Sequence, residues 1–163
     1  MNNLMNNLMK TLENACSEAV LSTKSGPEGD VILFKADSVR RIFETIKECS
    51  SENGRVLLSD ISAVNFENGD CRFELFYHLF FIDLRQRIAL KCRLSENRID
   101  SISDIMPAAL MPEREIFDMF GLKFTGLPEQ PRLFMHNEFE GHPLLREYPL
   151  LKRQISLERT RFE

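Results

Sequence analysis

A cluster of charged side chains in the stretch PEREIFDMFG, residues 112–121, is the first place where this sequence offers chemistry. Glu113, Arg114, Glu115 and Asp118 follow one another closely there. General acid–base catalysis needs two carboxylates whose surroundings separate their pKa values. Glu113 and Glu115 are two residues apart and face different sides of a helix, and Arg114 would keep a neighbouring carboxylate ionised. We therefore expect these side chains to serve in structure or binding rather than in catalysis.

A second candidate is His142, within EFEGHPLLREY. Its neighbours in sequence are charged or turn-forming: Glu140, Gly141, Pro143, Arg146 and Glu147. As a metal ligand His142 lacks companions, because His136 is six residues away and His78 falls in an expected strand. We favour a histidine that is hydrogen-bonded in a structured turn. A stand-alone soluble enzyme that uses His142 and Glu140 is the alternative of another class.

The cysteines do not form a metal-binding pattern. The four are Cys16, Cys49, Cys71 and Cys92. None forms a CxxC pair or has a histidine at ligand spacing, so we expect neither a zinc nor an iron–sulfur site built by this chain. Scattered cysteines without a signal peptide are typical of a reducing, cytosolic compartment.

Other catalytic motifs are missing from the sequence. It has no Gly-rich phosphate loop, no GxSxG elbow and no HExxH helix. The alternating basic residues of 85–93 could touch phosphate or an acidic partner, but they lack the interleaved aromatic residues of a nucleic-acid stacking platform. A solvated strand face is the interpretation that we favour for them.

Size and composition indicate one ordered domain that positions these residues. The chain has 163 residues, 43% hydrophobic and 28% charged, with a net charge of −4. The negative charge argues against a general nucleic-acid binder. No apolar run reaches the roughly 20 residues needed to span a bilayer.

The first half predicts helices and one strand. Leu4, Leu8, Leu12 and then Cys16 or Ala19 form one apolar helical stripe. STKSGPEGD predicts a loop, and VILFKAD predicts a strand. Asp37 or Ser38 is expected to cap a second helix. The apolar face of that helix holds Val39, Ile42, Phe43, Ile46 and Cys49, and Gly54 is placed to stop it.

The middle of the chain predicts β-structure. RVLLSDISAVNF is an expected strand, followed by a turn at ENGD and by a second strand in CRFELFYHLFFI. Residues 84–94 alternate strictly, with Leu84, Gln86, Ile88, Leu90, Cys92 and Leu94 on one side. An antiparallel hairpin is expected near IDLRQ, and the whole pattern predicts the α+β class.

The last third predicts a short helix and an extended segment. Pro112 suits a first helical position, Gly121 suits the helix end, and Arg114 can pair with Asp118 one turn later. A short helix that is apolar on two sides is buried on two sides, either within its own domain or against a partner. Beyond it, Pro128, Pro131 and Pro143 exclude long regular elements. That segment needs its own domain or another protein to lie on.

This last third resembles the 30 kDa subunit family of respiratory complex I, also called the C-subunit family. The matching residues are Glu113, Arg114, Glu115, Asp118, Met119, Phe120, Gly121, Arg132, Glu140, Gly141, His142, Pro143, Leu144 and Pro149. The resemblance covers about residues 73 to 150. Three positions depart from the family pattern: Leu127, Pro131 and Leu145 replace polar residues. Related subunits occur in energy-converting hydrogenases, formate hydrogenlyase and F420H2 dehydrogenases.

The resemblance implies a fold, a place and partners. The fold would have helices packed on a mixed, largely antiparallel sheet in residues 1–126, with an extended docking segment in residues 127–163. The chain would be a non-catalytic subunit of the hydrophilic arm of a membrane-bound complex I-like oxidoreductase. It would be peripheral on the cytoplasmic side of the membrane, beside the large (49 kDa) subunit and neighbouring iron–sulfur subunits.

The resemblance also implies which groups the chain binds. The chain itself would hold no cofactor or metal, while the complex would hold iron–sulfur clusters and quinone, with FMN if it uses NADH. The equivalent subunit of an energy-converting hydrogenase, formate hydrogenlyase or F420H2 dehydrogenase is the alternative within the class. The expected partner interface consists of Glu113, Arg114, Glu115, Asp118, Phe120, Gly121, Arg132, Glu140, Gly141, His142, Pro143 and Arg146. The charges of Glu113, Arg114 and Glu115 are expected to be buried and paired across or beside the contact.

Overall fold

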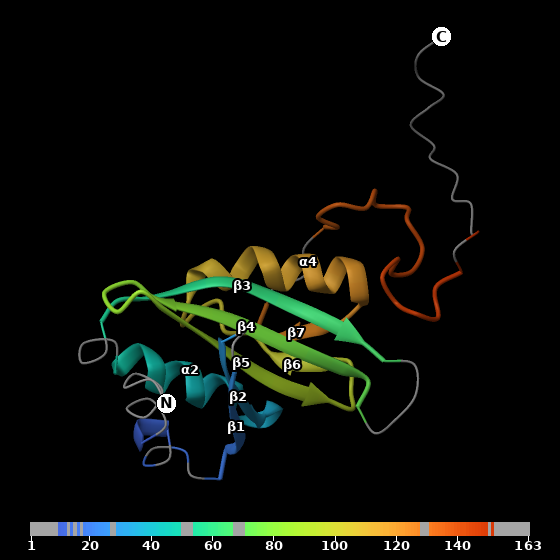
Figure 1. Cartoon of the computed structure of the whole chain (residues 1–163). Coiled ribbons are helices and arrows are strands. Elements are labelled where there is room, and N and C mark those ends of the chain that lie inside the picture. The colour runs from blue at the N-terminus through green and yellow to red at the C-terminus, as the bar shows by residue number, and fades with distance from the viewer. Residues whose placement is uncertain are drawn as a thin grey trace.

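The computed structural model describes residues 10–12, 14, 16, 18–26, 29–49, 54–66, 71–127, 131–149 and 151. A five-stranded sheet forms its centre (Figure 1). The strands are β1 (Val20–Gly26), β2 (Gly29–Lys35), β3 (Val56–Asn65), β4 (Phe73–Phe81) and β5 (Gln86–Leu94). Their order is β1-β2-β5-β4-β3, and only β2 and β5 run parallel. The expected mixed, largely antiparallel sheet is therefore confirmed.

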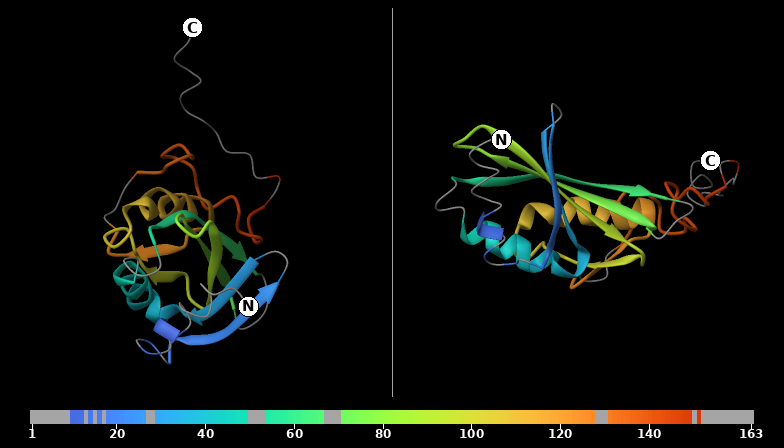
Figure 2. Two further views of the ribbon diagram at one scale, coloured as in Figure 1. Left: turned by 60° about the vertical axis from the view of Figure 1, so that its left-hand side comes forward. Right: turned by 60° about the horizontal axis from the view of Figure 1, so that its bottom comes forward.

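The helices cover one face of this sheet. They are α2 (Val39–Glu48), preceded by a 3₁₀ turn at Ala36–Ser38, and α4 (Leu110–Phe120), preceded by a 3₁₀ turn at Pro107–Ala109. A small parallel pair, β6 (Arg98–Asp100) with β7 (Lys123–Thr125), accompanies them. Figure 2 shows both helices on the same side of the sheet, which makes a two-layer arrangement.

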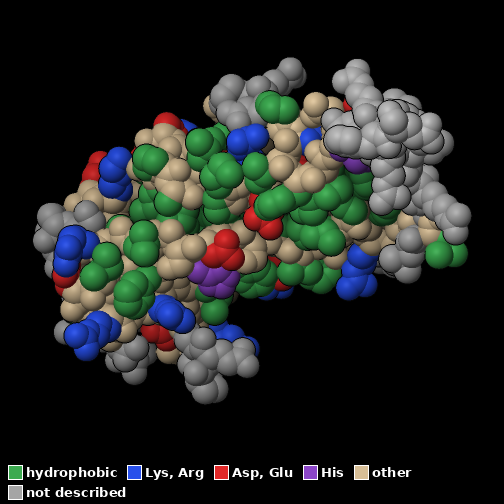
Figure 3. Space-filling model, turned by 90° about the horizontal axis from the view of Figure 1, so that it is seen from above, with side chains coloured by type: hydrophobic (Ala, Val, Ile, Leu, Met, Phe, Trp, Pro, Cys, Tyr) green, Lys and Arg blue, Asp and Glu red, His purple; other side chains and the backbone are tan. Residues whose placement is uncertain are grey.

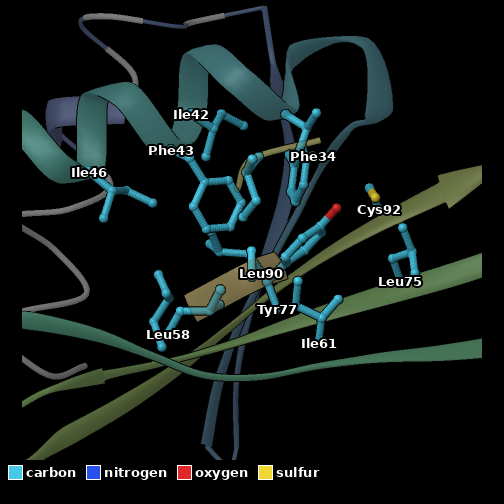
Figure 4. Packing of buried hydrophobic residues seen from close by; sticks show 14 of the residues in the cluster. Phe34, Ile42, Phe43, Ile46, Leu58, Ile61, Leu75, Tyr77, Leu90 and Cys92 are labelled. Atoms are coloured by element: carbon cyan, nitrogen blue, oxygen red, sulfur yellow. The ribbon is translucent and has the colours of Figure 1, made fainter. Parts of the chain in front are cut away.

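The core fills the space between the helices and the sheet. Tyr77 of β4 packs against Phe43 of α2, with ring centroids 4.9 Å apart, and against Phe34 of β2 at 6.2 Å (Figure 4). Leu12 and Cys16, from the helical stripe near the N-terminus, are also buried in this core. The expectation of an apolar stripe is confirmed for these two residues, while Leu4 and Leu8 lie outside the described part.

The alternation predicted for residues 84–94 is confirmed in β5. Ile88, Leu90, Cys92 and Leu94 are buried, whereas Arg87 and Arg93 are exposed. The hairpin near IDLRQ also forms, since Phe81 pairs with Gln86 in antiparallel register. Leu84 is an exception, because it lies in the turn and is exposed. The predicted turn residues of ENGD lie outside the described residues.

Several local predictions were wrong. The segment 22–30 was expected to be a loop, but residues 22–26 belong to strand β1 and residues 29–30 to strand β2, because pairing of the two strands satisfies their backbone groups. Helix α4 begins at Leu110, two residues before Pro112. Ser38 is the N-cap residue of α2, but its side chain makes no capping hydrogen bond. Gly54 does not stop α2, which ends at Glu48, and instead lies with φ +84° just before β3.

The segment after α4 has no regular secondary structure in residues 131–149. It lies against α4 and the end of β3, through the contacts described below. The division of the chain at residues 126 and 127 stays a prediction.

Candidate partner-binding surface

One buried ion pair fixes the start of the C-terminal segment. The Asp118 side chain is almost completely buried, and one of its oxygens accepts a hydrogen bond of 2.8 Å from Arg132 Nη1. The other oxygen accepts three backbone N–H groups in succession, from Leu133 at 3.1 Å, Phe134 at 2.7 Å and Met135 at 3.0 Å. The predicted pairing of Asp118 with Arg114 along the helix is therefore wrong, since Asp118 binds the segment instead.

The acid strength of Asp118 reflects these contacts. Burial by itself raises the pKa of this carboxyl, because it disfavours the charged form. The Arg132 guanidinium and the N–H groups of Phe134 and Met135 outweigh that effect and lower the pKa below its ordinary value. Asp118 is therefore ionised at neutral pH and holds the segment as a charged acceptor.

Arg132 gathers the following turn around itself. Its guanidinium donates to the Asp118 carbonyl at 3.0 Å, to the Phe139 carbonyl at 3.1 Å and to the Gly141 carbonyl at 2.8 Å. An arginine suits this role because its planar fork carries five N–H donors. We call Asp118 and Arg132, with the backbone groups that they bind, the Asp118–Arg132 clasp.

His142 closes the clasp against the end of α4. Its Nδ1 lies 3.0 Å from the Asp118 carbonyl oxygen and 3.4 Å from Arg132 Nη1. Its ring meets the Phe117 ring edge-on at 5.9 Å. Glycine is required at position 121 for two reasons. Its φ of +69° is a conformation that favours glycine, and a Cβ there would lie 2.5 Å from the His142 ring. His142 therefore has a structural position in a turn, as the sequence suggested.

Glu113 is the second buried carboxylate of α4. It is fully buried, and its oxygens accept hydrogen bonds from the Ile102 N–H at 2.9 Å and the Ser101 hydroxyl at 2.5 Å. Burial raises its pKa above the ordinary value, and the two hydrogen bonds only partly offset this. Glu113 is buried by its own chain, whereas its expected pairing across or beside a partner contact stays a prediction.

The other expected interface residues lie nearer the surface. Arg114 makes two long contacts, 3.3 Å to the Pro131 carbonyl and 3.9 Å to Met111 Sδ. Phe120 packs partly against the core, while Glu115 is exposed on α4. Further along, Glu140, Gly141 and Arg146 are exposed and Pro143 is half-buried.

Sequence reasoning missed the residues that hold the far end of the segment. The buried Asn65 side chain, at the end of β3, accepts the Arg146 N–H at 3.0 Å and donates to the Arg72 carbonyl at 3.2 Å. Arg72 also forms a 3.0 Å ion pair with Glu147. The segment residues Arg146 and Glu147 are more than 70 positions away from these partners, so no spacing rule could have found them.

Exposed apolar side chains lie along α4 and this segment. Among them are Leu110, Met111, Phe134 and Leu144, the last three between 52% and 61% exposed. We call these four residues, together with Arg114, the α4 surface. Figure 3 views the molecule from the side on which α4 and β3 lie uppermost, and hydrophobic side chains are spread over it with charged ones between them. Large exposed apolar side chains held in fixed positions are typical of a protein–protein contact.

No metal centre is found in the part of the chain that the structure describes, where no three His, Cys, Asp or Glu side chains converge. The described helices are also too short or too polar to cross a bilayer. The charged groups of this region hold the backbone of the C-terminal segment.

Comparison with known proteins identifies relatives of the chain. A sequence model of the family "Respiratory-chain NADH dehydrogenase, 30 Kd subunit" matches residues 32–154. The C subunit of NADH-quinone oxidoreductase from Moorella thermoacetica is 30% identical over 148 residues, which are 90% of this chain and 96% of that protein. The same subunit of Ruegeria sp. is 43% identical over 93 residues, 56% of this chain and 46% of that one. The chain spans about half the length of several of these curated relatives.

Two solved structures share the fold. One belongs to the membrane-bound sulfane sulfur reductase, described as an archaeal respiratory membrane complex. It superposes with a TM-score of 0.75 and 26% identity, over 92% of this chain and 88% of that one. The other is a trypsin-resistant fragment of Nqo5, with a TM-score of 0.59 and 18% identity over 76% of this chain and 98% of the fragment. At that identity the second likeness shows the fold alone.

Proposed function

Since the chain belongs to the family of the respiratory-chain NADH dehydrogenase 30 Kd subunit, we propose that it is a structural subunit in the hydrophilic arm of a membrane-bound, complex I-like oxidoreductase. The observation that carries this proposal is the match to the Moorella thermoacetica subunit over almost the full length of both chains. In the complex, electrons pass from NADH to quinone and this drives ion translocation. The chain contributes no catalytic centre of its own.

The α4 surface supports a docking role. The clasp holds Phe134 in place through its backbone N–H while the side chain stays 61% exposed. Rigid exposed aromatic residues contribute most to affinity in protein interfaces, because little conformational entropy is lost when they bind. The partner in this proposal is the large subunit that helps to form the quinone site, with iron–sulfur subunits nearby.

Arg114 gives this surface a charged anchor. Its guanidinium has only the two long contacts named above within the described part of the chain. An arginine with unused donors binds a carboxylate through two parallel hydrogen bonds. In this proposal Arg114 contacts a carboxylate of the large subunit.

The redox groups belong to other subunits in this proposal. The complex holds iron–sulfur clusters and quinone, with FMN if the donor is NADH, and it lies at the cytoplasmic side of the membrane. The alternative enzyme that uses His142 and Glu140 has less support, because His142 is packed between Gly121 and Phe117 and its Nδ1 faces the Asp118 carbonyl.

A related membrane complex is the second candidate. The chain shares its fold with a component of the archaeal sulfane sulfur reductase complex, at 26% identity. An energy-converting hydrogenase, a formate hydrogenlyase or an F420H2 dehydrogenase would use the same docking surface with a different large subunit.

Affinity purification of the tagged chain from its native membranes tests the proposal. We expect a quinone-site large subunit and flavin-containing NADH-oxidising subunits to co-purify. Co-purification of a nickel–iron large subunit would instead indicate one of the related complexes. Phe134→Asp should abolish co-purification, whereas Leu21→Asp, at a similarly exposed position on β1, should not. A monodisperse chain that purifies without companions would contradict the proposal.

A further inference from the structure

The face of the five-stranded sheet that points away from α2 and α4 carries no helix among the described residues (Figures 1 and 2). Residues that alternate with the core positions therefore form an outer surface. Its apolar members include Val31, Leu33, Leu57, Phe76, Phe80 and Ala89, and all of them are half-buried or exposed. We call this set the outer sheet surface. It contains none of the residues of the α4 surface.

A hollow of about 520 Å³ lies in this surface. Ala89 lines it, paired with Val31 on one side and His78 on the other. Phe76 and Phe80 flank His78 along β4, two residues away in either direction. The small side chain of Ala89 between larger neighbours makes room for a side chain from another molecule.

Each of the two aromatic rings is covered by a cation. Lys91 Nζ lies 4.9 Å from the centre of the Phe76 ring, and the Arg87 guanidinium lies 5.8 Å from the centre of the Phe80 ring. These contacts hold the basic side chains over the sheet. The hollow is thus flanked by two cation–aromatic pairs.

The same face of the sheet has an excess of positive charge, because Lys35, Arg87, Lys91 and Arg93 lie on it with the carboxylates Glu74 and Asp60, although the chain as a whole is negative, at −4. Glu74 forms ion pairs with Lys91 at 2.6 Å and Arg93 at 2.8 Å, so one carboxylate serves two cations. No ion pair of Arg87 is found among the described residues. A surface with surplus positive charge and apolar side chains is complementary to a partner with carboxylates beside an apolar stripe.

The occupant covers a face of the sheet and does not extend an edge. Edges of sheets are extended by strands, whereas faces of sheets are covered by helices or by a second sheet. From these observations we infer that the outer sheet surface is a second docking site, and that it binds an acidic amphipathic helix of a companion subunit. This inference rests on the proposed function as a subunit. The helix supplies the third layer that the two-layer fold lacks, with an apolar side chain in the hollow at Ala89 and carboxylates at Arg87.

Hydroxyl-radical footprinting of the purified complex tests this inference. Oxidation of Phe76 and Phe80 is compared between the free full-length chain and the chain in the complex. We expect both rings to be oxidised in the free chain and protected in the complex. With Phe80 replaced by a photo-crosslinking phenylalanine analogue, the cross-linked peptide should be a helical segment rich in Asp and Glu.

Charge variants make the test specific. Arg87→Glu should remove the protection of Phe76 and the cross-link, whereas Lys123→Glu, at an exposed position on the small second sheet, should leave both unchanged. Equal oxidation of the rings in the free and assembled chain would overturn the inference. So would a cross-link to lipid, or protection of the free chain by phosphatidylserine vesicles equal to that in the complex.

The design separates the two proposals. If the chain does not co-purify with other subunits, both the proposed function and the second docking site are refuted. If the chain co-purifies with other subunits in a way that depends on Phe134, but the rings of Phe76 and Phe80 stay unprotected from oxidation, only the second docking site is refuted.

Discussion

The Asp118–Arg132 clasp makes a sharp prediction, because one carboxylate serves four donors. Asp118→Asn keeps the shape of the side chain and one carbonyl oxygen, but it removes the negative charge and one acceptor. The single amide oxygen cannot accept hydrogen bonds from both the Arg132 guanidinium and the three backbone N–H groups that the carboxylate binds. At least one buried donor therefore loses its partner.

The size of the effect follows from the burial of the pair. Asp118 is 1% exposed and the Arg132 side chain 17% exposed, so water screens the interaction little. Hydrogen bonds to charged groups contribute about 1.5–3 kcal/mol each, and removing one partner of a buried ion pair costs about 3–5 kcal/mol. Because asparagine retains part of the bonding, we expect Asp118→Asn to lower the free energy of unfolding by about 2–3 kcal/mol.

The assay is urea denaturation followed by fluorescence or circular dichroism, combined with hydrogen exchange. The amides of Leu133, Phe134 and Met135 should exchange faster in Asp118→Asn, because they lose a charged acceptor. The effect also depends on pH. The folded-state pKa of Asp118 lies below the ordinary value of 3.8, so its stabilisation is present above that value and is lost as the pH falls through the lowered pKa. The difference between wild type and variant should therefore disappear in strong acid.

Glu115→Gln is the matched control, since Glu115 lies on the same helix and is exposed. It should change the free energy of unfolding by less than about 0.5 kcal/mol. In a double-mutant cycle with Arg132→Gln, the two losses should be clearly non-additive. The reasoning is refuted if the free energy of unfolding of Asp118→Asn lies within about 0.5 kcal/mol of the wild-type value and hydrogen exchange at residues 133–135 is unchanged.

Three further predictions concern other buried groups. Gly121→Ala should lower the free energy of unfolding by about 2–4 kcal/mol, because it adds backbone strain and a clash with His142. Gly126→Ala, whose Cβ would meet nothing within 4 Å, should lose only about 1–2 kcal/mol by the same urea titration, and equal losses would disprove the clash. Tyr77→Phe should leave stability unchanged or raise it by up to about 1 kcal/mol, since the buried hydroxyl has no hydrogen-bond partner among the described residues; a loss above about 1 kcal/mol would reveal a missed partner. The folded-state pKa of Glu113 is raised above the ordinary value of 4.5. Wild type should therefore lose stability relative to Glu113→Gln as the pH rises from 4.5 through that raised pKa. A difference in the free energy of unfolding that stays constant with pH would argue against the raised pKa.

The sequence predicted the sheet best where one face is buried. Strict alternation in residues 86–94 indicated both the strand and its buried side, because the period of two is a direct consequence of strand geometry. Strand β1 was missed because residues 22–25 are exposed and polar, so they carry no such alternation. Their pairing with β2 is decided by backbone hydrogen bonds, which a side-chain pattern does not report.

The sequence indicated residues of the Asp118–Arg132 clasp but not how they pair. The resemblance singled out Asp118, Arg132 and His142, which the structure brings together. The helix rule of four residues favoured Arg114 as the partner of Asp118, whereas the true partner is fourteen residues away. Local spacing cannot foresee that choice, because it depends on how the segment folds back over the helix. Burial of Glu113 by its own chain was hidden for the same reason.

The three successive N–H groups on one oxygen of Asp118 have a consequence for the kinetics of assembly. They give residues 133–135 a fixed backbone shape without a helix or a strand. A partner that meets this segment does not have to fold it, so association should proceed as a collision of two preformed shapes, with a rate set by diffusion and orientation.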